Sequence, residues 1–270
     1  MSEQKHSFRH NTLNLDQAYY YALLIYVEAT SFSVAVTYND QLLAYETNCA
    51  LNELNDPQQL QDILSATYKK TIVALSSSVF SLVPDPLFNP DHITGFARLL
   101  DVKANEKVLA QVLDEKNHVV YKVYEQQWTA IAKLDLKNLV FASKGWIKAI
   151  AQNNPLNNQL YVNIGNNTIE FLYFKHNNIR LYNTFEFNNA DDVVYFSTLV
   201  TDELDMLPPY TTLVLSGNIT GEDEIYTHLT AFFPDVVLNK IKLLELPEQI
   251  APHQILSLAA LTLCESSEAV

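Results

Sequence analysis

One pattern of secondary structure is predicted twice along this chain, the second copy starting about 140 residues after the first. Each copy has three short strands joined by tight turns, followed by a helix and a fourth strand. The segments are residues 19–28, 33–38, 41–47, 56–68 and 71–75 in the first copy, and 160–165, 168–175, 179–187, 191–206 and 211–215 in the second. A chain that repeats such a unit is expected to form two similar lobes of mixed α/β structure.

Further elements are predicted between the two copies and after the second one. They are extended segments at 82–84 and 236–246, strands at 119–124 and 138–142, and helices at 89–100, 125–134, 143–152, 223–232 and 252–264. The last helix is apolar over most of its surface, so we expect it to be buried. We therefore expect lobe I to comprise residues 13–154 with 248–270, lobe II to comprise 155–247, and residues 1–12 to form a flexible tail.

The charge of the chain restricts its partners. The formal net charge is −14, from 17 Lys and Arg against 31 Asp and Glu. This acidic balance argues against binding a nucleic-acid backbone, which needs a clustered cationic surface. It argues equally against docking on anionic membranes. A basic protein partner or a metal cation stays compatible with it, as does a charge that serves solubility alone.

Cysteines, histidines and the N-terminal segment indicate a cytoplasmic protein without a metal site. Cys49 and Cys264 stand far apart and outside any CxxC pair, so we expect two buried free thiols. The histidines form no HxH or HxxxH pair suited to a metal, apart from His6 and His10, which lie in the predicted tail. Residues 1–14 are polar and lack a signal-peptide core, and the apolar run at 19–27 is too short to span a bilayer.

Polar residues and glycines gather at the ends of three predicted strands. Residues 160–170 read Leu-Tyr-Val-Asn-Ile-Gly-Asn-Asn-Thr-Ile-Glu, and residues 214–221 read Val-Leu-Ser-Gly-Asn-Ile-Thr-Gly. Residues 25–33 read Ile-Tyr-Val-Glu-Ala-Thr-Ser-Phe-Ser. Three of the five glycines in the chain fall inside the first two motifs, which is a concentration hard to obtain by chance.

These motifs, together with the duplicated βββαβα lobes, resemble the actin-like ATPase superfamily of actin, Hsp70 and sugar kinases, which has a ribonuclease H-like fold. The second hairpin resembles the family's strand–Asp–hydrophobic–Gly–Gly–Gly–Thr–x–Asp, with Asn163 and Glu170 in place of the two Asp residues. Residues 214–221 resemble the family's strand–Thr/Ser–Gly–Gly turn. The first hairpin has Glu28 where the family has Asp. The chain looks closest to uncharacterised bacterial proteins with this fold, and more distantly similar to actin-like proteins of pilus-assembly and secretion machines.

The resemblance implies a nucleotide site between the lobes, where one hairpin from each lobe grips the phosphates of Mg-ATP. The positions of this chain that match the site are Glu28, Thr30, Asn163, Gly165, Asn167, Thr168, Glu170, Gly217 and Asn218. We expect this cofactor site to be degenerate, and we expect no catalytic residues.

The expectation of a degenerate site without catalytic residues rests on the positions where this chain departs from the family pattern. Glycine lets a hairpin backbone approach a phosphate closely, and the first hairpin has none. Asn166 and Asn167 can take positive φ and still make a turn, but they add bulk at the phosphate face. Metal-assisted phosphoryl transfer needs carboxylates around Mg²⁺, and one of them has become the neutral Asn163.

We therefore expect a non-catalytic scaffold for interaction or assembly, with a protein partner or a second copy of the chain. The alternative is a nucleotide-binding ATPase or kinase, in which Glu28, Asn163 and Glu170 hold Mg²⁺; a cleft for another small ligand is a third reading. A cleft filled by Phe32 and Asn166 would favour the scaffold, whereas converging carboxylates would favour the ATPase. An exposed apolar patch away from the cleft would indicate a binding partner.

Overall fold

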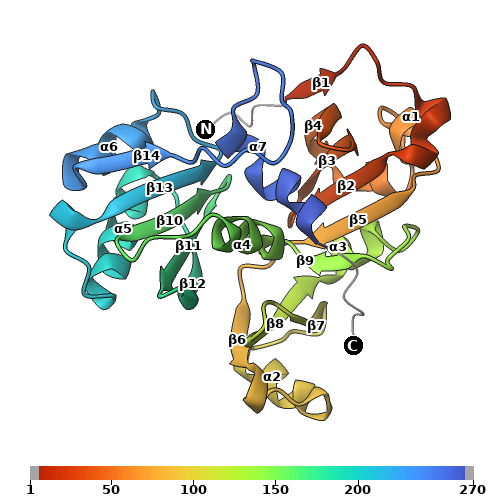
Figure 1. Ribbon diagram of the computed structural model, residues 1–270. Helices are drawn as coiled ribbons and strands as arrows, with labels where there is room; N and C mark the ends of the chain where they lie inside the picture. The colour runs from red at the N-terminus through yellow and green to blue at the C-terminus, as the bar shows by residue number, and fades with distance from the viewer. Residues whose placement is uncertain (1–5, 265–270) are drawn as a thin grey trace. The chain divides into compact units, whose positions relative to one another are not determined.

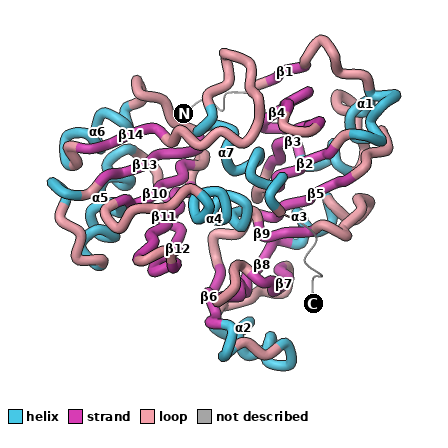
Figure 2. The backbone as a smooth tube through the Cα atoms, viewed as in Figure 1, coloured by secondary structure: helices cyan, strands magenta, loops and turns pink. Residues whose placement is uncertain are grey.

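The computed structural model describes residues 6–264. The chain forms two compact units: unit 1 comprises Met1–Trp146 and Leu258–Val270, and unit 2 comprises Ile147–Ser257. The boundaries expected from the sequence, after residue 154 and after residue 247, lie eight residues after the first boundary of the units and ten residues before the second. The ribbon and the backbone tube show the strands and helices of each unit (Figures 1 and 2). Within the described residues, no helix combines the length and the apolar character needed to cross a membrane.

Unit 1 is built on a six-stranded sheet with the order β1-β4-β3-β2-β5-β9. In that order the strands are Ser7–Arg9, Gln41–Ala50, Ser31–Tyr38, Ala22–Val27, Lys70–Leu75 and Leu139–Phe141. The pairs β2–β3 and β3–β4 are antiparallel, whereas β2–β5 and β5–β9 are parallel.

Unit 2 repeats this arrangement in a five-stranded sheet with the order β12-β11-β10-β13-β14. The strands are Asn178–Glu186, Thr168–Lys175, Gln159–Ile164, Thr212–Gly217 and Asp235–Leu238. Its first three strands are antiparallel neighbours, and β10–β13 and β13–β14 are parallel. In both sheets the first strand of the copy, β2 or β10, lies between the others. The next two strands of the copy lie on one side of it (β3 and β4, or β11 and β12), and two parallel strands lie on the other side (β5 and β9, or β13 and β14). The predicted duplication is therefore confirmed.

The helices surround these sheets. They are α1 (Gln61–Leu64), α2 (Ile93–Leu99), α3 (Glu125–Ala130), α4 (Ser143–Gln152), α5 (Ala190–Glu203), α6 (Glu224–Phe232) and α7 (Pro252–Ala259). In unit 2, α5 and α6 pack on one face of the sheet around a core that includes Phe171, Leu215 and Phe233, each fully or almost fully buried. In unit 1, Gly145 of α4 lies so close to the chain after α7 that an added Cβ would stand 2.6 Å from the Ala260 carbonyl oxygen.

An inserted three-stranded sheet lies between β5 and β9 of unit 1. Its order is β6-β8-β7, with β6 at Phe80–Pro84, β7 at Glu106–Val112 and β8 at Asn117–Tyr124. One face of this inserted sheet packs against α2, and Gln111 on its other face forms hydrogen bonds with β9. The Gln111 amide donates to the Leu139 carbonyl at 3.0 Å and accepts from the Phe141 N–H at 2.8 Å. The side chain therefore occupies the place of a neighbouring strand beside β9. The sequence patterns did not predict β7.

Two local predictions differ from the structure in the first part of the chain. The helix predicted over residues 56–68 is reduced to α1. Instead, the Glu53 carboxylate accepts hydrogen bonds from the backbone N–H groups of three residues ahead of α1, namely Gln58, Gln59 and Leu60. Because these N–H groups are directed to Glu53, the helix begins only at Gln61.

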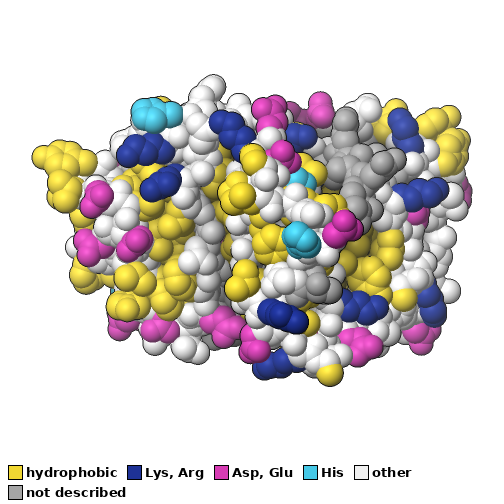
Figure 3. Space-filling model, turned by 90° about the horizontal axis from the view of Figure 1, so that it is seen from below, with side chains coloured by type: hydrophobic (Ala, Val, Ile, Leu, Met, Phe, Trp, Pro, Cys, Tyr) yellow, Lys and Arg dark blue, Asp and Glu magenta, His cyan; other side chains and the backbone are white. Residues whose placement is uncertain are grey.

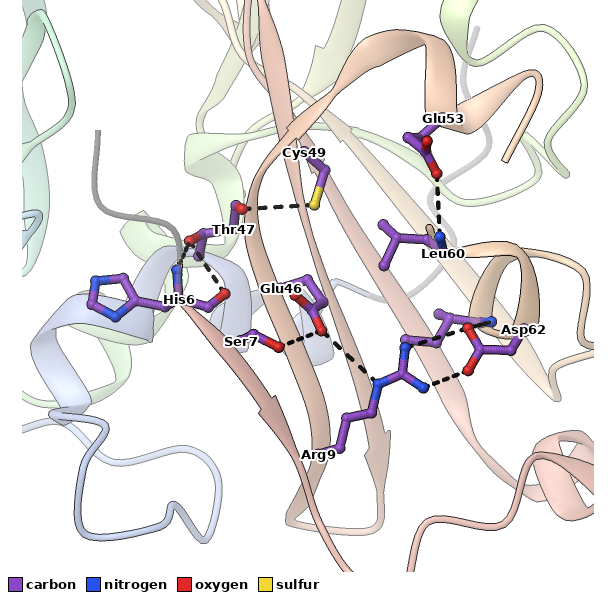
Figure 4. A network of polar contacts seen from close by, with 10 residues as sticks. His6, Ser7, Arg9, Glu46, Thr47, Cys49, Glu53, Leu60 and Asp62 are labelled. Carbon is purple, nitrogen blue, oxygen red and sulfur yellow. Dashed lines mark hydrogen bonds and ion pairs between the residues drawn. The ribbon is translucent and has the colours of Figure 1, made fainter. Parts of the chain in front are cut away.

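The second difference concerns the predicted N-terminal tail. Ser7–Arg9 form β1, which pairs antiparallel with β4. Figure 4 shows the polar network that holds β1: Arg9 binds the carboxylate of Asp62 with two nitrogens, and the Ser7 hydroxyl donates to Glu46 at 2.7 Å. The backbone N–H of His6 donates to the Thr47 hydroxyl at 2.8 Å. Residues 7–9 of the predicted tail are thus part of the sheet edge.

Candidate functional site

The polar residues predicted for the site lie at the ends of the central strands in both units. In unit 2 the hairpin between β10 and β11 closes where the Gly165 N–H donates to the Thr168 carbonyl at 2.8 Å. In unit 1 the Glu28 N–H donates to the Ser31 carbonyl at 2.9 Å in the hairpin between β2 and β3. The two hairpins are therefore equivalent residue by residue, and Glu28 corresponds to Gly165.

The strand registers extend this equivalence to the predicted acidic positions. Asn163 pairs with Glu170 across β10 and β11, one step before the hairpin ends. The corresponding pair in unit 1 is Tyr26 with Ser33. The sequence motif had set Glu28 opposite the family's Asp, as Asn163 is. The registers instead place Tyr26 at the position of Asn163, because hairpin geometry and not residue type defines the repeat.

Asn163, Glu170 and Tyr182 form a buried hydrogen-bond chain on one face of the unit 2 sheet. The Asn163 amide donates to one Glu170 carboxylate oxygen at 2.6 Å, and the Tyr182 hydroxyl donates to the other at 2.6 Å. All three side chains are less than a tenth exposed. Hydrogen bonds of this length to a carboxylate are charge-assisted and strong. Glu170 therefore has both of its oxygens engaged within the protein.

Gly217 closes the site beside Asn163. Its φ is +90°, in the region that favours glycine. A Cβ there would lie 2.2 Å from the Ile164 carbonyl oxygen and 2.8 Å from the Asn163 side-chain oxygen. That Asn163 oxygen is buried and has no hydrogen-bond partner among the described residues. An acceptor and a close-approach glycine are thus set side by side at the ends of β10 and β13.

The turn after β13 is fixed by two buried side chains. Asn239 donates to the Ser216 hydroxyl oxygen at 3.1 Å, and its own side-chain oxygen accepts from the Ile241 N–H at 3.0 Å. His253 Nε2 lies 2.8 Å from the Ile219 carbonyl oxygen, and the geometry requires the ring to donate there. Burial lowers the pKa of His253, so the neutral ring is favoured. The sequence motifs contained Ser216 but gave no signal for Asn239, His253 or Tyr182.

The exposed part of the unit 2 site consists of asparagines. Asn166, Asn167 and Asn218 are all exposed, and the Asn218 amide lies 3.4 Å from the Asn166 side-chain oxygen. We expected the asparagines of the hairpin to make the turn with positive φ. Neither Asn166 nor Asn167 does so; the hairpin after β11 uses such residues instead, at His176 and Asn177.

In unit 1 the equivalent site is filled differently. Glu28 is half-buried and accepts from the Ser31 hydroxyl at 3.1 Å, while Thr30 is exposed. Burial, and after it the nearby Glu28 carboxylate, raise the pKa of Tyr45. Phe32, which the sequence suggested as a filler of the cleft, is fully buried in the unit 1 core. Leu75, also fully buried, stands where unit 2 has Gly217, because Val27 pairs with Leu75 as Ile164 pairs with Gly217.

A metal would find few charged ligands within either unit. Among residues 6–264, no three His, Cys, Asp or Glu side chains come close enough together to hold a metal ion. In unit 2 the available donors at the site are the Asn163 oxygen, the Glu170 carboxylate and neutral hydroxyl or amide groups. The close-approach glycines suit a phosphate better than this donor set suits Mg²⁺.

Comparison with known proteins identifies the fold. Residues 10–236 match the family described as "Protein of unknown function (DUF3822)". None of the curated proteins matches the sequence. A Bacteroides thetaiotaomicron protein with an actin-like ATPase fold and unknown function superposes with a TM-score of 0.79 at 19% identity, over 94% of this chain and 100% of that one.

Two further structures show the same fold at greater distance. The PilM-PilN type IV pilus biogenesis complex superposes with a TM-score of 0.55 at 12% identity, over 90% of this chain and 97% of that one. The ethanolamine utilization protein EutJ from Carboxydothermus hydrogenoformans gives 0.50 at 9% identity, over 91% of this chain and 90% of that one. The expected actin-like ATPase fold is therefore confirmed.

Proposed function

The chain belongs to the DUF3822 family of proteins of unknown function, and we propose that it is a non-catalytic actin-like protein that serves as a scaffold for interaction or assembly. One observation carries the first half of this proposal. Both carboxylate oxygens of Glu170 accept short hydrogen bonds from within the protein, one from the Asn163 amide and one from the Tyr182 hydroxyl.

This arrangement disfavours phosphoryl transfer. Mg²⁺ is held by carboxylates and phosphate oxygens, and the metal neutralises charge that develops on the phosphoryl group. To ligate a metal, Glu170 would have to share its oxygens between the metal and these two bonds, and displacing either bond would leave a buried donor unpaired, which costs roughly 1–3 kcal/mol per group. Asn163 has no charge to replace what is lost. The site is therefore better suited to hold its own sheet together than to bind a metal.

Unit 1 supports the same conclusion. At the position of Gly165 it carries Glu28, whose side chain stands where the backbone would have to approach a phosphate. The carboxylate is negative, and a phosphate nearby would be repelled. A hairpin of this composition is suited to structural contacts such as its bond with Ser31.

The scaffold half of the proposal rests on surface chemistry and on one relative. PilM, which shares the fold, is described in a complex with PilN. The acidic surface of this chain favours a protein partner with basic groups over nucleic acid or anionic lipid. We place the protein in the cytoplasm, with a different protein as its partner and a homodimer as the other option.

A second candidate function is nucleotide binding, and Gly217 is the observation that favours it. The left-handed backbone at this position and the unpartnered Asn163 oxygen are set at the strand ends. If Mg-ATP binds, Gly165, Thr168, Gly217 and Asn218 would lie against it from unit 2, and the nucleotide would supply the phosphoryl group for an ATPase or phosphotransferase reaction. These residues would serve only to bind and orient it.

A thermal-shift titration of the full chain with Mg-ATP and Mg-ADP separates the two functions. A ligand that binds only the native state stabilises it by about 2.7 kcal/mol at a hundred times its dissociation constant. We expect no change in melting temperature at millimolar nucleotide beyond the change with Mg²⁺ alone. A clear shift that disappears in Asn218→Ala, an exposed position that leaves the fold intact, would establish the second candidate and exclude the first.

A further inference from the structure

The outer face of α5 and α6 in unit 2 carries two parallel stripes of side chains. Both helices lead back from the end of one strand to the start of the next parallel strand, so they run in the same direction. On α5 the positions Asp191, Tyr195, Leu199 and Glu203 are spaced four residues apart and are all exposed. On α6 the same spacing places Glu224, His228 and Phe232 on one side.

A hydrogen-bonded pair joins the first residue of the α5 stripe, Asp191, to the middle residue of the α6 stripe, His228. His228 Nδ1 of α6 lies 3.0 Å from a carboxylate oxygen of Asp191 on α5, and His228 Nε2 lies 3.8 Å from Glu224. Since the helices are parallel, one further turn brings Tyr195 on α5 and Phe232 on α6 to the same level. The two stripes therefore face outward side by side and form one surface, which we name the α5–α6 face.

The middle of the α5–α6 face is apolar and exposed. The exposed fractions are 61% for Tyr195, 43% for Leu199 and 62% for Phe232. Single exposed apolar residues are common, but three large ones on adjoining helix stripes form a patch of the kind that marks a binding surface. Figure 3, a view from below that of Figure 1, shows hydrophobic side chains reaching the surface in groups, with Asp and Glu and also Lys and Arg side chains among them.

The rim of the α5–α6 face is acidic at both ends. Asp191 and Glu224 lie before the apolar residues, and Asp202 and Glu203 lie after them. Residues 181–239 contain ten Asp and Glu and no Lys or Arg. This segment supplies all of α5 and α6, so their surface has no Lys or Arg of its own to neutralise the carboxylates.

We propose that the α5–α6 face binds an amphipathic helix of a partner protein, with an apolar stripe flanked by Lys and Arg. The inference rests on the scaffold function proposed above and names the chemistry of the partner. A partner helix that lies between α5 and α6 on this face would place its apolar side chains on Tyr195, Leu199 and Phe232. Its cations would meet the carboxylates at both ends, and complementary charge raises association rates and selects partners.

The same charge pattern disfavours other occupants. A second copy would bring its own acidic rim against this one, and like charges across an interface oppose binding. An anionic bilayer or a nucleic acid would be repelled for the same reason. A basic helix is the one occupant for which both the apolar centre and the rim contribute.

The proposal is tested with a fluorescent peptide of about 18 residues, long enough to form a helix on binding, that has leucines on one face and lysines on its flanks. Anisotropy titration with the full chain is expected to show saturable binding. Leu199→Ser and Phe232→Ser should each weaken it about tenfold, and raising the ionic strength from about 0.05 M to 0.5 M should weaken it by a similar factor. Asp202→Lys with Glu203→Lys should reduce that salt dependence.

Matched controls decide whether the binding is specific. Leu156→Ser removes another exposed leucine of unit 2, 56% exposed and outside both helices, and should leave binding within about twofold of the parent chain. A peptide of the same composition in scrambled order should bind at least about tenfold more weakly. The proposal is overturned if the peptide does not bind at low salt, if scrambled and ordered peptides bind alike, or if Leu199→Ser and Phe232→Ser have no effect.

Two further measurements separate this inference from the function on which it rests. Sedimentation of the chain alone tests the second copy: a dimer that dissociates in Phe232→Ser would assign the face to self-association and overturn the proposal. Repeating the peptide titration with Mg-ATP present distinguishes the two claims. If nucleotide raises the melting temperature and the peptide still binds, only the non-catalytic function is contradicted. If nucleotide causes no shift and the peptide does not bind, only the proposed binding of a partner helix is contradicted.

Discussion

The hairpin between β2 and β3 in unit 1 and the hairpin between β10 and β11 in unit 2 close with the same backbone bonds but carry different side chains. In each, the first residue after the strand donates to the residue three positions on, and the following parallel strand donates back, from Ser76 to Val27 and from Asn218 to Ile164. Unit 2 keeps a glycine at both close-approach positions, whereas unit 1 has Glu28 and Leu75. The difference teaches that the same backbone geometry of a duplicated fold accommodates glycine in one copy and large side chains in the other.

The strongest test of this comparison replaces Gly217 and Leu75 with alanine, because these equivalent residues differ most in size. Gly217→Ala should destabilise the chain by roughly 3–5 kcal/mol, because the alanine would have a strained φ and its Cβ would clash with the Ile164 carbonyl. Leu75→Ala, at the equivalent position, should cost about 2–5 kcal/mol for the opposite reason, the loss of a fully buried side chain. Urea unfolding followed by circular dichroism measures both. A neutral Gly217→Ala would show that the two positions are not structurally different.

A second test introduces a second carboxylate in unit 2 with Asn163→Asp. The new carboxylate would lie beside Glu170, where the Asn163 amide is now 2.6 Å away, so the pair should share a proton. A carboxyl whose pKa is raised in the native state binds more protons there than when unfolded, so stability should fall as the pH rises. We expect a loss of about 2 kcal/mol at pH 8 that is largely recovered at pH 5.

The control for this change is Ser33→Asp in unit 1, at the position that corresponds to Glu170, where the residue paired across the strands is Tyr26 and not a carboxylate. It should lack the fall in stability with rising pH. Thermal unfolding between pH 5 and pH 8 measures both variants. If millimolar Mg²⁺ restores the stability of Asn163→Asp at pH 8, unit 2 has kept a latent metal site, and the contrast between the units is sharper than proposed.

A third test uses the side chains that hold the two equivalent turns after the fourth strand. In unit 1 the buried Gln127 amide donates to the Ser76 carbonyl at 3.1 Å, and in unit 2 His253 contacts the Ile219 carbonyl. Because burial lowers the pKa of His253, its contribution is present above its unfolded pKa and is lost as the pH falls through the folded value. Unit 2 should therefore lose stability on acidification from pH 8 toward pH 5, and unit 1 should not.

Hydrogen exchange resolved by peptide measures this loss separately in β13 and in β5. Only β13 should lose protection at lower pH, and His253→Gln should remove most of the pH dependence. Equal loss in both strands would contradict the assignment to His253.

The smallest effect is expected at β1, the additional edge strand of unit 1. Its hydrogen bond from Arg9 is the main cause of the lowered pKa of Asp62, so this stabilisation is present above the unfolded pKa and is lost as the pH falls through the folded value. The pair is about two-fifths exposed, so Arg9→Ala should cost less than about 1 kcal/mol. Faster hydrogen exchange in β4 of Arg9→Ala, with no change in β12, would confirm a local effect. A large drop in melting temperature would contradict it.

The architecture could be predicted from the sequence because it depends on patterns that repeat. Alternating apolar residues and turn residues define the strands of both copies, and the sheet orders agree. Local interactions limited the prediction elsewhere. The helix expected from residue 56 is shortened since Glu53 binds the N–H groups ahead of it, a contact that no propensity reveals. The sequence did not predict β7 because this strand mixes polar and apolar residues and is only half-buried over much of its length.

The candidate site was only partly accessible to the same reasoning. Asn163, Glu170 and Gly217 could be found because glycines and polar residues stand out at strand ends. Tyr182 could not, since it reaches Glu170 as a diagonal neighbour across two strands, and the diagonal depends on register. His253 is farther still in sequence from Ile219. The correspondence of Tyr26, and not Glu28, with Asn163 likewise required the observed hairpin bonds.

The amide of Gln111 affects whether another chain can pair with the edge strand β9. An uncovered edge strand is a template on which another chain can polymerise, and proteins protect such edges. Here one glutamine side chain satisfies both the N–H of Phe141 and the carbonyl of Leu139, so β9 offers no pair of groups at this point for an incoming strand. At this edge of the unit 1 sheet an incoming strand would first have to displace the Gln111 side chain of the inserted sheet.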